Sequence, residues 1–370
     1  MKILAIETSC DETAVAIVEN GTTILTNTLT SSTQVHEKYG GVVPEVAARN
    51  QVEYMIPVLT EGMFGFTKDD IDAIAVTIGP GLIGSLLIGV ETAKTLAFVW
   101  NKPLIPVNHV LAHMYANFVP NVVEGQNSSR AQGCTIRYVP QSRDHKQIVF
   151  PAISLVVSGG HTELYLMEST KNLKWLGGTL DDAAGECFDK TARLLGFGNR
   201  GGLAIQETAC KFNVHSSSFT VKFPRPMLHD DSLNFSFSGL KTAVARDWNK
   251  YVSNPQLTTD NLQLVSAFAY EIQEAITDVL VQKTLKAAQK YNAKSILLSG
   301  GVASNLRLRE QFNLSLVTYH LSSIKLFVPP VQLCTDNAVY IGAYAYFHRN
   351  SVDWRKVEAQ PDLSVEIVDF

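Results

Sequence analysis

The sequence predicts an α/β protein of two similar lobes with a cleft between them. Two segments, 2–18 and 152–166, predict strand–turn–strand hairpins, because β-rich apolar runs flank a turn of small polar residues in each. The same pattern recurs about halfway along the chain, which indicates two related halves. Alternating helical and strand patterns follow each hairpin, and this order is typical of layered α/β domains.

The region after the first hairpin alternates between helices and strands. A helical pattern over 44–62 is followed by a capping-box-like helix start at Thr67–Asp70, with Asp in place of the usual Glu. We then expect a buried strand over 73–78, a long and mostly buried helix over 82–100, a short strand over 104–107 and a short helix over 109–118.

The region after the second hairpin repeats this alternation. We expect helices over 181–195, 262–290 and 336–349, and a strand over 295–299 that runs into Gly300 and Gly301.

A chain of 370 residues is too long for one typical domain and fits two compact lobes. We expect the first lobe at 1–119 and the second at 151–370, with the C-terminal helix region returning toward the first lobe. Residues 120–150 are polar, aperiodic and rich in turn formers, so we predict an exposed insertion there.

Composition is that of an ordinary globular protein, with 46% hydrophobic and 18% charged residues. No run of eighteen apolar residues is free of Gly, Pro and charges, so we expect no membrane span. The early acid Glu7 argues against a signal peptide, and we expect a cytoplasmic protein. Five cysteines without a C-x-x-C pair argue against a zinc ribbon and against a disulfide framework.

The sharpest local signal is the pair His109 and His113. Residues four apart share one helix face and can ligate one metal ion together. Val110 stands where the zincin motif H-E-x-x-H has its glutamate, so that motif is absent. The alternative is an exposed polar stripe, because a pair alone does not reveal a third ligand. Asp336 is the candidate for that ligand, and a carboxylate with two imidazoles suits iron or zinc in a catalytic site.

Glycine-rich turns after predicted strands are candidate phosphate-binding loops. Ser158–Thr162 lies at the second hairpin, and its two glycines would let backbone N–H groups approach a phosphate. Ser299–Asn305 follows a buried strand and opens a helix, where the helix N-terminus favours negative charge. Gly79–Ser85 is a similar turn. Each of these could also be an ordinary tight connection, and none has the spacing of G-x-G-x-x-G or of the P-loop.

Two groups of acids complete the candidate chemistry. The first hairpin turn offers Asp11 and Glu12, which could hold a cation or accept a proton, or could simply be solvated. Acids at 182, 186 and 189 have the spacing of one helix face, and the residues between them are small and apolar. We therefore expect this acidic stripe to face a polar cleft.

Taken together, six motifs resemble the TsaD family, whose bacterial and mitochondrial branch has the Ser-Cys-Asp-Glu-Thr form seen here. The motifs run in order along nearly the whole chain, and their agreement is far more specific than any one of them. They are Glu7–Thr13, His109–His113, Val157–Thr162, Leu180–Glu186, Phe235–Lys241 and Cys334–Asn337.

The resemblance implies the actin/Hsp70/sugar-kinase architecture, with two ribonuclease-H-like lobes around a nucleotide cleft. It implies transfer of a threonylcarbamoyl group from threonylcarbamoyl-adenylate to the exocyclic amine of the adenosine 3′ of the anticodon, in tRNAs reading codons that begin with A. One divalent metal per chain, iron first and zinc as the alternative, would be bound by His109, His113 and Asp336. The adenylate would be bound by Val156, Val157, Ser158, Gly159, Gly160, Asp189, Gly202 and Asn305. Our own candidates for the group that receives the amine proton are Asp11 and Glu12.

The implied partners are tRNA, a TsaB-like paralogue and a TsaE-like ATPase, and a homodimer is a further alternative. Because the net charge of −4 gives no general attraction to a polyanion, we expect tRNA binding to depend on a partner or on a local basic patch. The candidate cations are Lys190, Arg193, Arg200, Arg225, Lys241 and Arg246.

The chain departs from the family pattern at two places. One is the stretch from Pro120 to Lys146, which is longer than the family's usual connection, and the other is a loop. The family has Pro-Gly-Gly-Pro where this sequence has Arg200-Gly201-Gly202-Leu203, so the loop loses the rigidity of two prolines. Three other functions compete with the transferase: a metalloprotease, a kinase of the same fold class and a non-catalytic scaffold of the same complex. The first lacks its glutamate base, the second has no use for the histidine pair, and the third would be expected to lose the ligand set that this chain keeps.

Overall fold

The computed structural model describes residues 1–36, 41–119, 122–124, 134–135, 138–140, 147–198, 201–212, 221–252 and 261–366. The chain divides into two compact units, each described here by itself. Unit 1 comprises Met1–Ile148, Glu168–Lys174 and Val328–Phe370, and unit 2 comprises Val149–Met167 and Trp175–Phe327.

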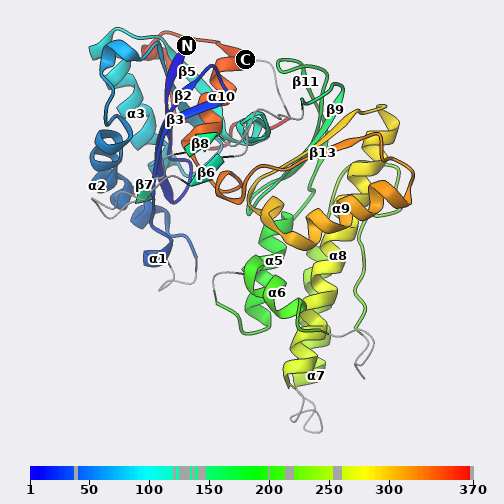
Figure 1. Cartoon of the computed structure of the whole chain (residues 1–370). Helices are drawn as coiled ribbons and strands as arrows, with labels where there is room; N and C mark the ends of the chain where they lie inside the picture. Colours follow the sequence, from blue (N-terminus) through cyan, green and yellow to red (C-terminus); the bar gives the residue numbers. More distant parts are fainter. Residues whose placement is uncertain are drawn as a thin grey trace. The chain divides into compact units, whose positions relative to one another are not determined.

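Unit 1 is built on a mixed sheet with the strand order β5-β4-β1-β2-β3-β7 (Figure 1). The predicted first hairpin is confirmed, since β1 pairs antiparallel with β2 and parallel with β4. The strands are β1 (Lys2–Glu7), β2 (Glu12–Glu19), β3 (Thr23–Ser31), β4 (Ala73–Gly79), β5 (Leu104–Asn108) and β7 (Cys134–Thr135).

Helices cover both faces of this sheet. Side chains alternate along β1 and β2, so that Leu4 and Ile17 enter a core shared with Met55 and Val90 of the helices on one face. On the other face, Gly342 lets a helix approach Val18 closely. The helices of unit 1 are α1 (Thr33–His36), α2 (Pro44–Gly62), α3 (Ile83–Trp100), α4 (His109–His113) and α10 (Ala338–His348), with 3₁₀ turns at Lys68–Asp70, Met114–Phe118, Val331–Leu333 and Trp354–Lys356.

Helix α3 is less buried than the sequence suggested. One face packs against α2 and β4 through residues such as Val90 and Ala93, but Ile83, Leu87 and Phe98 are exposed. Within the described residues α3 alone is long and apolar enough to cross a membrane by length and composition. One such helix is weak evidence, because a helix packed on the sheet of a globular unit passes the same test.

The C-terminal segment covers the turn between β4 and α3. The backbone N–H of Gln360 donates to the carbonyl of Ile78 (2.6 Å), and Gly81 donates to the carbonyl of Pro361 (3.1 Å). A Cβ atom on Gly79 would lie 1.9 Å from the Gln360 carbonyl oxygen, so only glycine fits this close approach. The same segment accepts a hydrogen bond from the Asn108 side chain at the carbonyl of Ser364 (3.0 Å).

Most of the predicted insertion at 120–150 lies outside the described residues. Its expected exposure therefore stays a prediction. The described parts include β6 (Val122–Glu124) and β8 (Tyr138–Pro140), which pair antiparallel with each other. Strand β7 adds to the edge of the unit 1 sheet at β3.

Unit 2 contains a second mixed sheet with the order β11-β10-β9-β12-β13. The predicted second hairpin is confirmed, because β9 pairs antiparallel with β10, while β12 lies parallel to β9 on its other side. The strands are β9 (Ala152–Val157), β10 (Thr162–Met167), β11 (Leu173–Gly178), β12 (Ser295–Ser299) and β13 (Lys325–Phe327).

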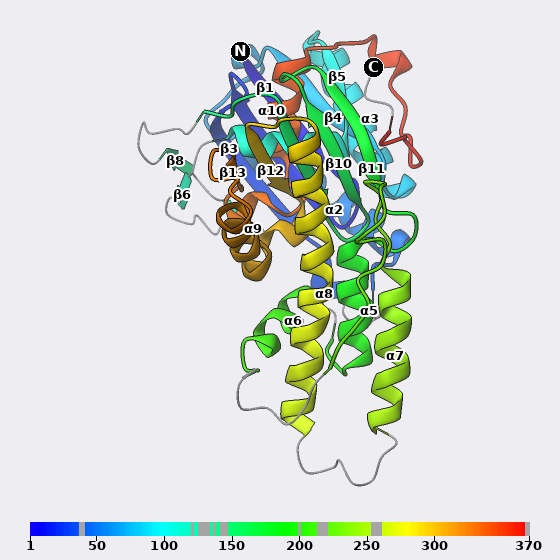
Figure 2. The ribbon, with the colours of Figure 1, turned by 90° about the vertical axis from the view of Figure 1, so that its right-hand side faces the viewer.

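Long helices pack against one another in unit 2. Figure 2 shows α5, α7 and α8 side by side, and all three pairs are in contact. The helices are α5 (Ala184–Leu194), α6 (Gly201–Ala209), α7 (Ser238–Val252), α8 (Asn261–Lys290) and α9 (Leu306–Thr318).

Two predicted helices begin later than expected. Helix α5 begins at Ala184 rather than at residue 181, because the Asp181 carboxylate accepts hydrogen bonds from the backbone N–H groups of Phe237 (2.7 Å) and Ser238 (3.2 Å) at the start of α7. Helix α10 begins at Ala338, since the Asn337 side chain caps it by accepting from the N–H of Val339 (3.0 Å).

We predict that Gly342→Val destabilises unit 1 by about 1–3 kcal/mol, because a Cβ atom there would lie 2.8 Å from Val18 Cγ2 and a larger side chain overpacks the contact. Gly342→Ala should cost less. Gly41→Val is the control, since nothing lies within 4 Å of a Cβ atom there. Urea unfolding measures the effect, and equal stability of the Gly342→Val and Gly41→Val variants would contradict the role given to this helix contact.

Candidate functional site

The predicted histidine pair occupies one turn of α4. The side-chain oxygen of Asn108, at the end of β5, accepts hydrogen bonds from the N–H groups of Val110 (3.0 Å) and Leu111 (3.2 Å) and so starts the helix. His109 and His113 are both buried, and their ring centroids lie 4.7 Å apart. This burial excludes the alternative of an exposed polar stripe.

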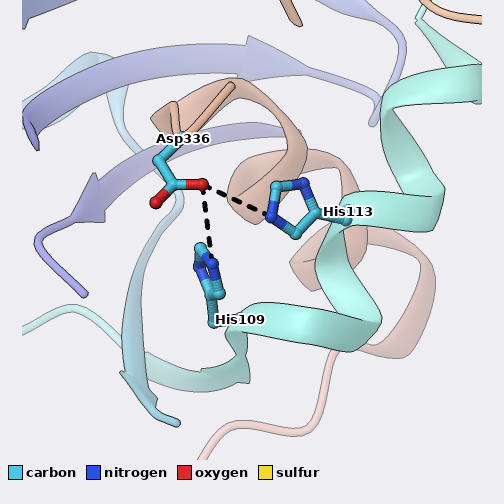
Figure 3. A group of neighbouring side chains, drawn as sticks. All are labelled: His109, His113 and Asp336. Atoms are coloured by element: carbon cyan, nitrogen blue, oxygen red, sulfur yellow. Dashed lines mark ion pairs between the residues drawn. The ribbon is translucent and has the colours of Figure 1, made fainter. Parts of the chain in front are cut away.

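Asp336 meets the two histidines from the other end of the sequence. Its Oδ1 lies 3.6 Å from His109 Nε2 and 3.4 Å from His113 Nε2, as Figure 3 shows. The hydroxyl of Tyr340, one turn into α10, lies 3.4 Å from the same Oδ1 and 3.5 Å from His113 Nε2. One ligand atom from each of the three predicted residues therefore faces a common point.

The spacing of these atoms fits a metal ion. The three ligand atoms all lie within 4.8 Å of one another. Ligands at about 2.0–2.2 Å from a tetrahedral ion are separated by about 3.3–3.6 Å, which matches the two distances to Asp336. Two neutral nitrogens and one carboxylate oxygen also form the donor set of known catalytic iron and zinc sites. We call His109, His113 and Asp336 the candidate metal group.

Charge coupling inside the candidate metal group is strong. Burial by itself would lower the pKa of His109, but the carboxylates of Asp336 and Glu7 raise it to about 9. Burial lowers the pKa of His113. For Asp336, burial by itself would raise the pKa, but the neighbouring His109 and His113 hold it well below its usual range. The two carboxylates therefore favour a positive charge at His109, and a metal bound at its Nε2 would compete with a proton on that atom.

Two residues beside the candidate metal group were not singled out from the sequence. Tyr340 follows Asp336 by one helical turn, and Glu7 is a fully buried acid 3.2 Å from His109 Nδ1. An acid at the end of an otherwise apolar strand was the signal that could have identified Glu7, since an unpaired buried charge is costly. The aromatic ring of Tyr340 gave no comparable signal.

Asp11 and Glu12 lie in the turn of the first hairpin. Burial, followed by the charges of Asp11 and Asp336, raises the pKa of Glu12 well above its usual range. Asp11 accepts a hydrogen bond from Thr33 Oγ1 (3.0 Å). The same burial and charges raise the pKa of the Cys10 thiol. The turn is therefore not a freely solvated one, and Glu12 is within electrostatic reach of Asp336.

In unit 2 the two predicted glycine turns emerge at one edge of the sheet. β9 and β12 are parallel neighbours, with Val156 opposite Ser299, so both turns follow the carboxyl ends of adjacent strands. Gly300 has a φ of +87°, and a Cβ atom there would lie 2.4 Å from the carbonyl oxygen of Val157. By contrast, nothing lies within 4 Å of a Cβ atom on Gly159 or Gly160. The turn at Gly159 and Gly160 thus borders open space, whereas Gly300 of the second turn packs closely against the backbone of Val157.

The remaining predicted binding residues form two further groups. The carboxylate of Asp189 accepts from the backbone N–H groups of Gly201 and Gly202, while burial raises its pKa. Asn305 caps α9 by accepting from Leu308 N (2.9 Å), and its amide donates to Gln273 Oε1 (3.1 Å). A pocket of about 450 Å³ adjoins it, lined by Gln206, Ala209, Cys210, Phe212, Tyr270, Gln273, Leu306, Arg307 and Glu310.

The loop that lacks the family's prolines is only partly described, because Arg200 lies outside the described residues. Helix α6 nevertheless begins at Gly201, directly before Gly202, and the Leu203 side chain is exposed. A Cβ atom on Gly201 would lie 2.4 Å from Asp189 Oδ1. Glycine at this position is therefore what allows the carboxylate to meet the helix start.

The acidic stripe of the sequence is divided in the structure. Asp182 precedes α5, and it accepts from Lys190 (2.9 Å) and Lys241 (2.8 Å). Glu186 also pairs with Lys190 (2.7 Å), while Asp189 meets the start of α6 instead. The three acids do not form one stripe, because two are neutralised by lysines and the third is held by backbone donors.

Comparisons with known proteins identify the family of this chain. The sequence model of one family, described as TsaD: tRNA N6-adenosine threonylcarbamoyltransferase, matches residues 23–127 and 136–343. A protein of that name from Syntrophomonas wolfei is 45% identical over 350 residues, covering 94% of this chain and 92% of that protein. Another of the same name from Persephonella marina is 42% identical over 380 residues, covering 100% and 98%.

Solved structures show the same fold at low identity. HypF of T. kodakarensis superposes with a TM-score of 0.54 at 12% identity, over 94% of this chain and 47% of that one. This likeness concerns the fold alone and confirms the predicted α/β class and its actin-like architecture. The family, by contrast, follows from the match over most of the sequence. The chain belongs to the TsaD family of tRNA N6-adenosine threonylcarbamoyltransferases.

Proposed function

We propose that this protein transfers a threonylcarbamoyl group from threonylcarbamoyl-adenylate to the exocyclic amine of the adenosine 3′ of the anticodon, in tRNAs reading codons that begin with A, and releases AMP. The observation that carries the proposal is the candidate metal group, in which residues 223 positions apart in a TsaD-family sequence converge within 4.8 Å. A non-catalytic scaffold would have no need of this buried ligand set.

His109, His113 and Asp336 would hold one divalent metal, iron or, alternatively, zinc. Bound there, the metal would supply a Lewis acid for the negative charge that develops as AMP leaves. The residues of this chain prepare the site by burying two imidazoles and by presenting both Nε2 atoms to Asp336. Burial of the two imidazoles also keeps water away from their nitrogens, while Asp336 is partly exposed.

We assign the adenylate to unit 2, at Val156, Val157, Ser158, Gly159, Gly160, Asp189, Gly202 and Asn305. The open space at Gly159 and Gly160 supports contact between a phosphate and backbone N–H groups. The side chains of Val156 and Val157 are buried, so these two residues would contribute backbone only. Asn305 already caps α9, and we propose that it shapes the adjoining pocket rather than offering a free amide.

Asp11 or Glu12 would receive the proton that the amine loses. We propose Glu12 first, because burial and the Asp11 charge raise its pKa, and a carboxylate with a raised pKa binds a proton more strongly than an ordinary one. Removing this proton as the new bond forms prevents the amine from leaving again.

A tRNA partner requires a basic surface that the sequence candidates do not supply by themselves. Lys190, Lys241 and Arg225 are held in ion pairs with acids, and Arg246 is paired with its neighbour Asp247. Arg200 lies outside the described residues. We therefore propose that a partner subunit contributes to tRNA binding, with a TsaB-like paralogue and a TsaE-like ATPase as candidates and a homodimer as the alternative. The exposed apolar side chains of α3 support association with a partner subunit. We also propose that the protein is cytoplasmic.

We predict that the double variant His109→Ala/His113→Ala loses the metal and at least ~100-fold of transfer activity, because one carboxylate cannot hold the ion alone. Metal content by mass spectrometry and modified nucleoside formed on unmodified tRNA are the two measurements. The control is His229→Ala, an exposed histidine in unit 2. Full metal occupancy in a folded double variant would refute the assignment.

We predict that Gly160→Val weakens AMP binding at least ~10-fold, about 1.4 kcal/mol, by filling the space next to the backbone donors. The fold should be unaffected, because a Cβ atom at this position meets no atom within 4 Å. Calorimetric titration of AMP measures the effect, with Gly41→Val as the control in unit 1. An affinity equal to that of the unsubstituted protein would remove Gly160 from the site.

We predict that the isolated chain binds tRNA weakly and that a partner subunit strengthens binding. Each phosphate contact should contribute about −0.7 to −0.9 to the slope of log affinity against log salt concentration. Titrations of unmodified tRNA into the chain, with and without the TsaB-like and TsaE-like proteins, at several salt concentrations, measure both quantities. Tight, steeply salt-dependent binding by the isolated chain would show that its own surface suffices.

A further inference from the structure

Glu7 is a charged group in a place where a charge is costly. It ends β1, whose preceding residues Ile3, Leu4, Ala5 and Ile6 are all fully buried, and its own side chain has 0% exposure. A buried carboxylate is tolerated only when hydrogen bonds replace its water. The contacts of its two carboxylate oxygens therefore indicate the role of Glu7.

A backbone N–H and a side-chain hydroxyl supply two of these contacts. Oε1 accepts from the backbone N–H of Ser9 (2.6 Å), and Oε2 accepts from Thr77 Oγ1 (2.5 Å). The parallel pairing of β1 with β4 sets Ile6 opposite Val76, which brings Thr77 beside Glu7. The carboxylate is thus held from two sides by elements of the sheet and cannot rotate without losing a hydrogen bond.

The third contact of this carboxylate is with a member of the candidate metal group. Oε2 lies 3.2 Å from His109 Nδ1, and Ser9 Oγ lies 3.2 Å from the same nitrogen. On the opposite side of the ring, His109 Nε2 lies 3.6 Å from Asp336 Oδ1. The ring is therefore placed between two carboxylates, of which only Asp336 belongs to the ligand set.

His113 provides the contrast within the same helix. Its Nε2 also faces Asp336, but its Nδ1 is buried without a hydrogen-bond partner among the described residues. One histidine of the group is thus oriented by a fixed acceptor, and the other is not.

We propose that Glu7 is the positioning residue of the metal centre: it accepts a hydrogen bond from the Nδ1–H of His109 and so leaves Nε2 as the nitrogen that is directed at the metal. A carboxylate that accepts from the Nδ1–H of an imidazole fixes both its tautomer and its ring orientation, and it increases the basicity of the coordinating nitrogen. The inference rests on the proposed metal-binding role of His109. The experiments below distinguish a failure of the Glu7 role from a failure of metal binding itself.

Glu7→Gln is the informative variant, because it keeps the size of the side chain and replaces one acceptor oxygen by an N–H donor. The Ser9 N–H would retain the remaining oxygen, so the amide N–H₂ would face His109 Nδ1 and oppose a proton there. The neutral ring would then carry its proton on Nε2, the ligand atom. Thr77→Val is the matched control, since it removes a partner of the carboxylate and leaves the acceptor on His109 in place.

The first measurement is zinc affinity of the metal-depleted full chain in competition with a chelating dye. Glu7→Gln should weaken zinc binding about 10–100-fold, and Thr77→Val less than about threefold. If Glu7 has a purely structural role, the loss of zinc affinity in each variant should follow that variant's loss of folding stability, and the two variants should behave alike. Zinc affinity of Glu7→Gln within about threefold of the unsubstituted protein would overturn the proposal.

The second measurement is nitrogen-15 NMR of the zinc-loaded, histidine-labelled protein. We expect His109 to coordinate zinc through Nε2 and to show a downfield Nδ1–H proton that Thr77→Val retains. Coordination through Nδ1 would overturn the proposal even if Glu7→Gln failed to fold. If the unsubstituted protein binds no zinc, or if the double histidine variant binds it equally well, the metal assignment itself fails. If zinc binds at the histidines and Glu7→Gln does not weaken it, only the role of Glu7 fails.

Discussion

The burial of one imidazole between two carboxylates is the constraint around which this part of unit 1 is arranged. Glu7 and Asp336 lie on either side of His109, and His113 completes the group. Without a metal, the two carboxylates raise the pKa of His109 to about 9, so that a proton balances part of the buried negative charge. A metal ion would replace that proton, and the same arrangement that stabilises the proton therefore favours a divalent cation.

The rest of unit 1 holds these groups in place. Asn108 caps α4 and is itself bonded to the carbonyl of Ser364, so the C-terminal segment reaches the helix that carries both histidines. Gly342 sets how closely α10 lies on the sheet and with it the position of Asp336. Two of the three ligands share helix α4, and the third, Asp336, lies directly before α10. Asn108 caps the first of these helices and Asn337 caps the second.

Unit 2 repeats the hairpin-led sheet but carries a different chemistry. Its glycine turns follow the adjacent parallel strands β9 and β12, where backbone N–H groups become available at a sheet edge. Gly300 is required for close packing, whereas a Cβ atom on Gly159 or Gly160 would meet no atom within 4 Å, which leaves room for the proposed phosphate contact. Under the proposed function, one unit would offer side-chain ligands and the other backbone donors.

The sequence by itself determined the periodic and local features: both hairpins, the strands at 73–78 and 295–299, and the pair His109–His113, because strand alternation and helical spacing are properties of neighbouring residues. Only the tertiary structure decided the role of Glu7, the exposure of α3 and the division of the acids at 182, 186 and 189. These depend on which elements pack together. A carboxylate is solvated, neutralised by a lysine or directed toward a histidine according to which residues pack beside it. Those residues can lie more than two hundred positions away, as His113 and Asp336 do, and spacing along the chain does not encode them.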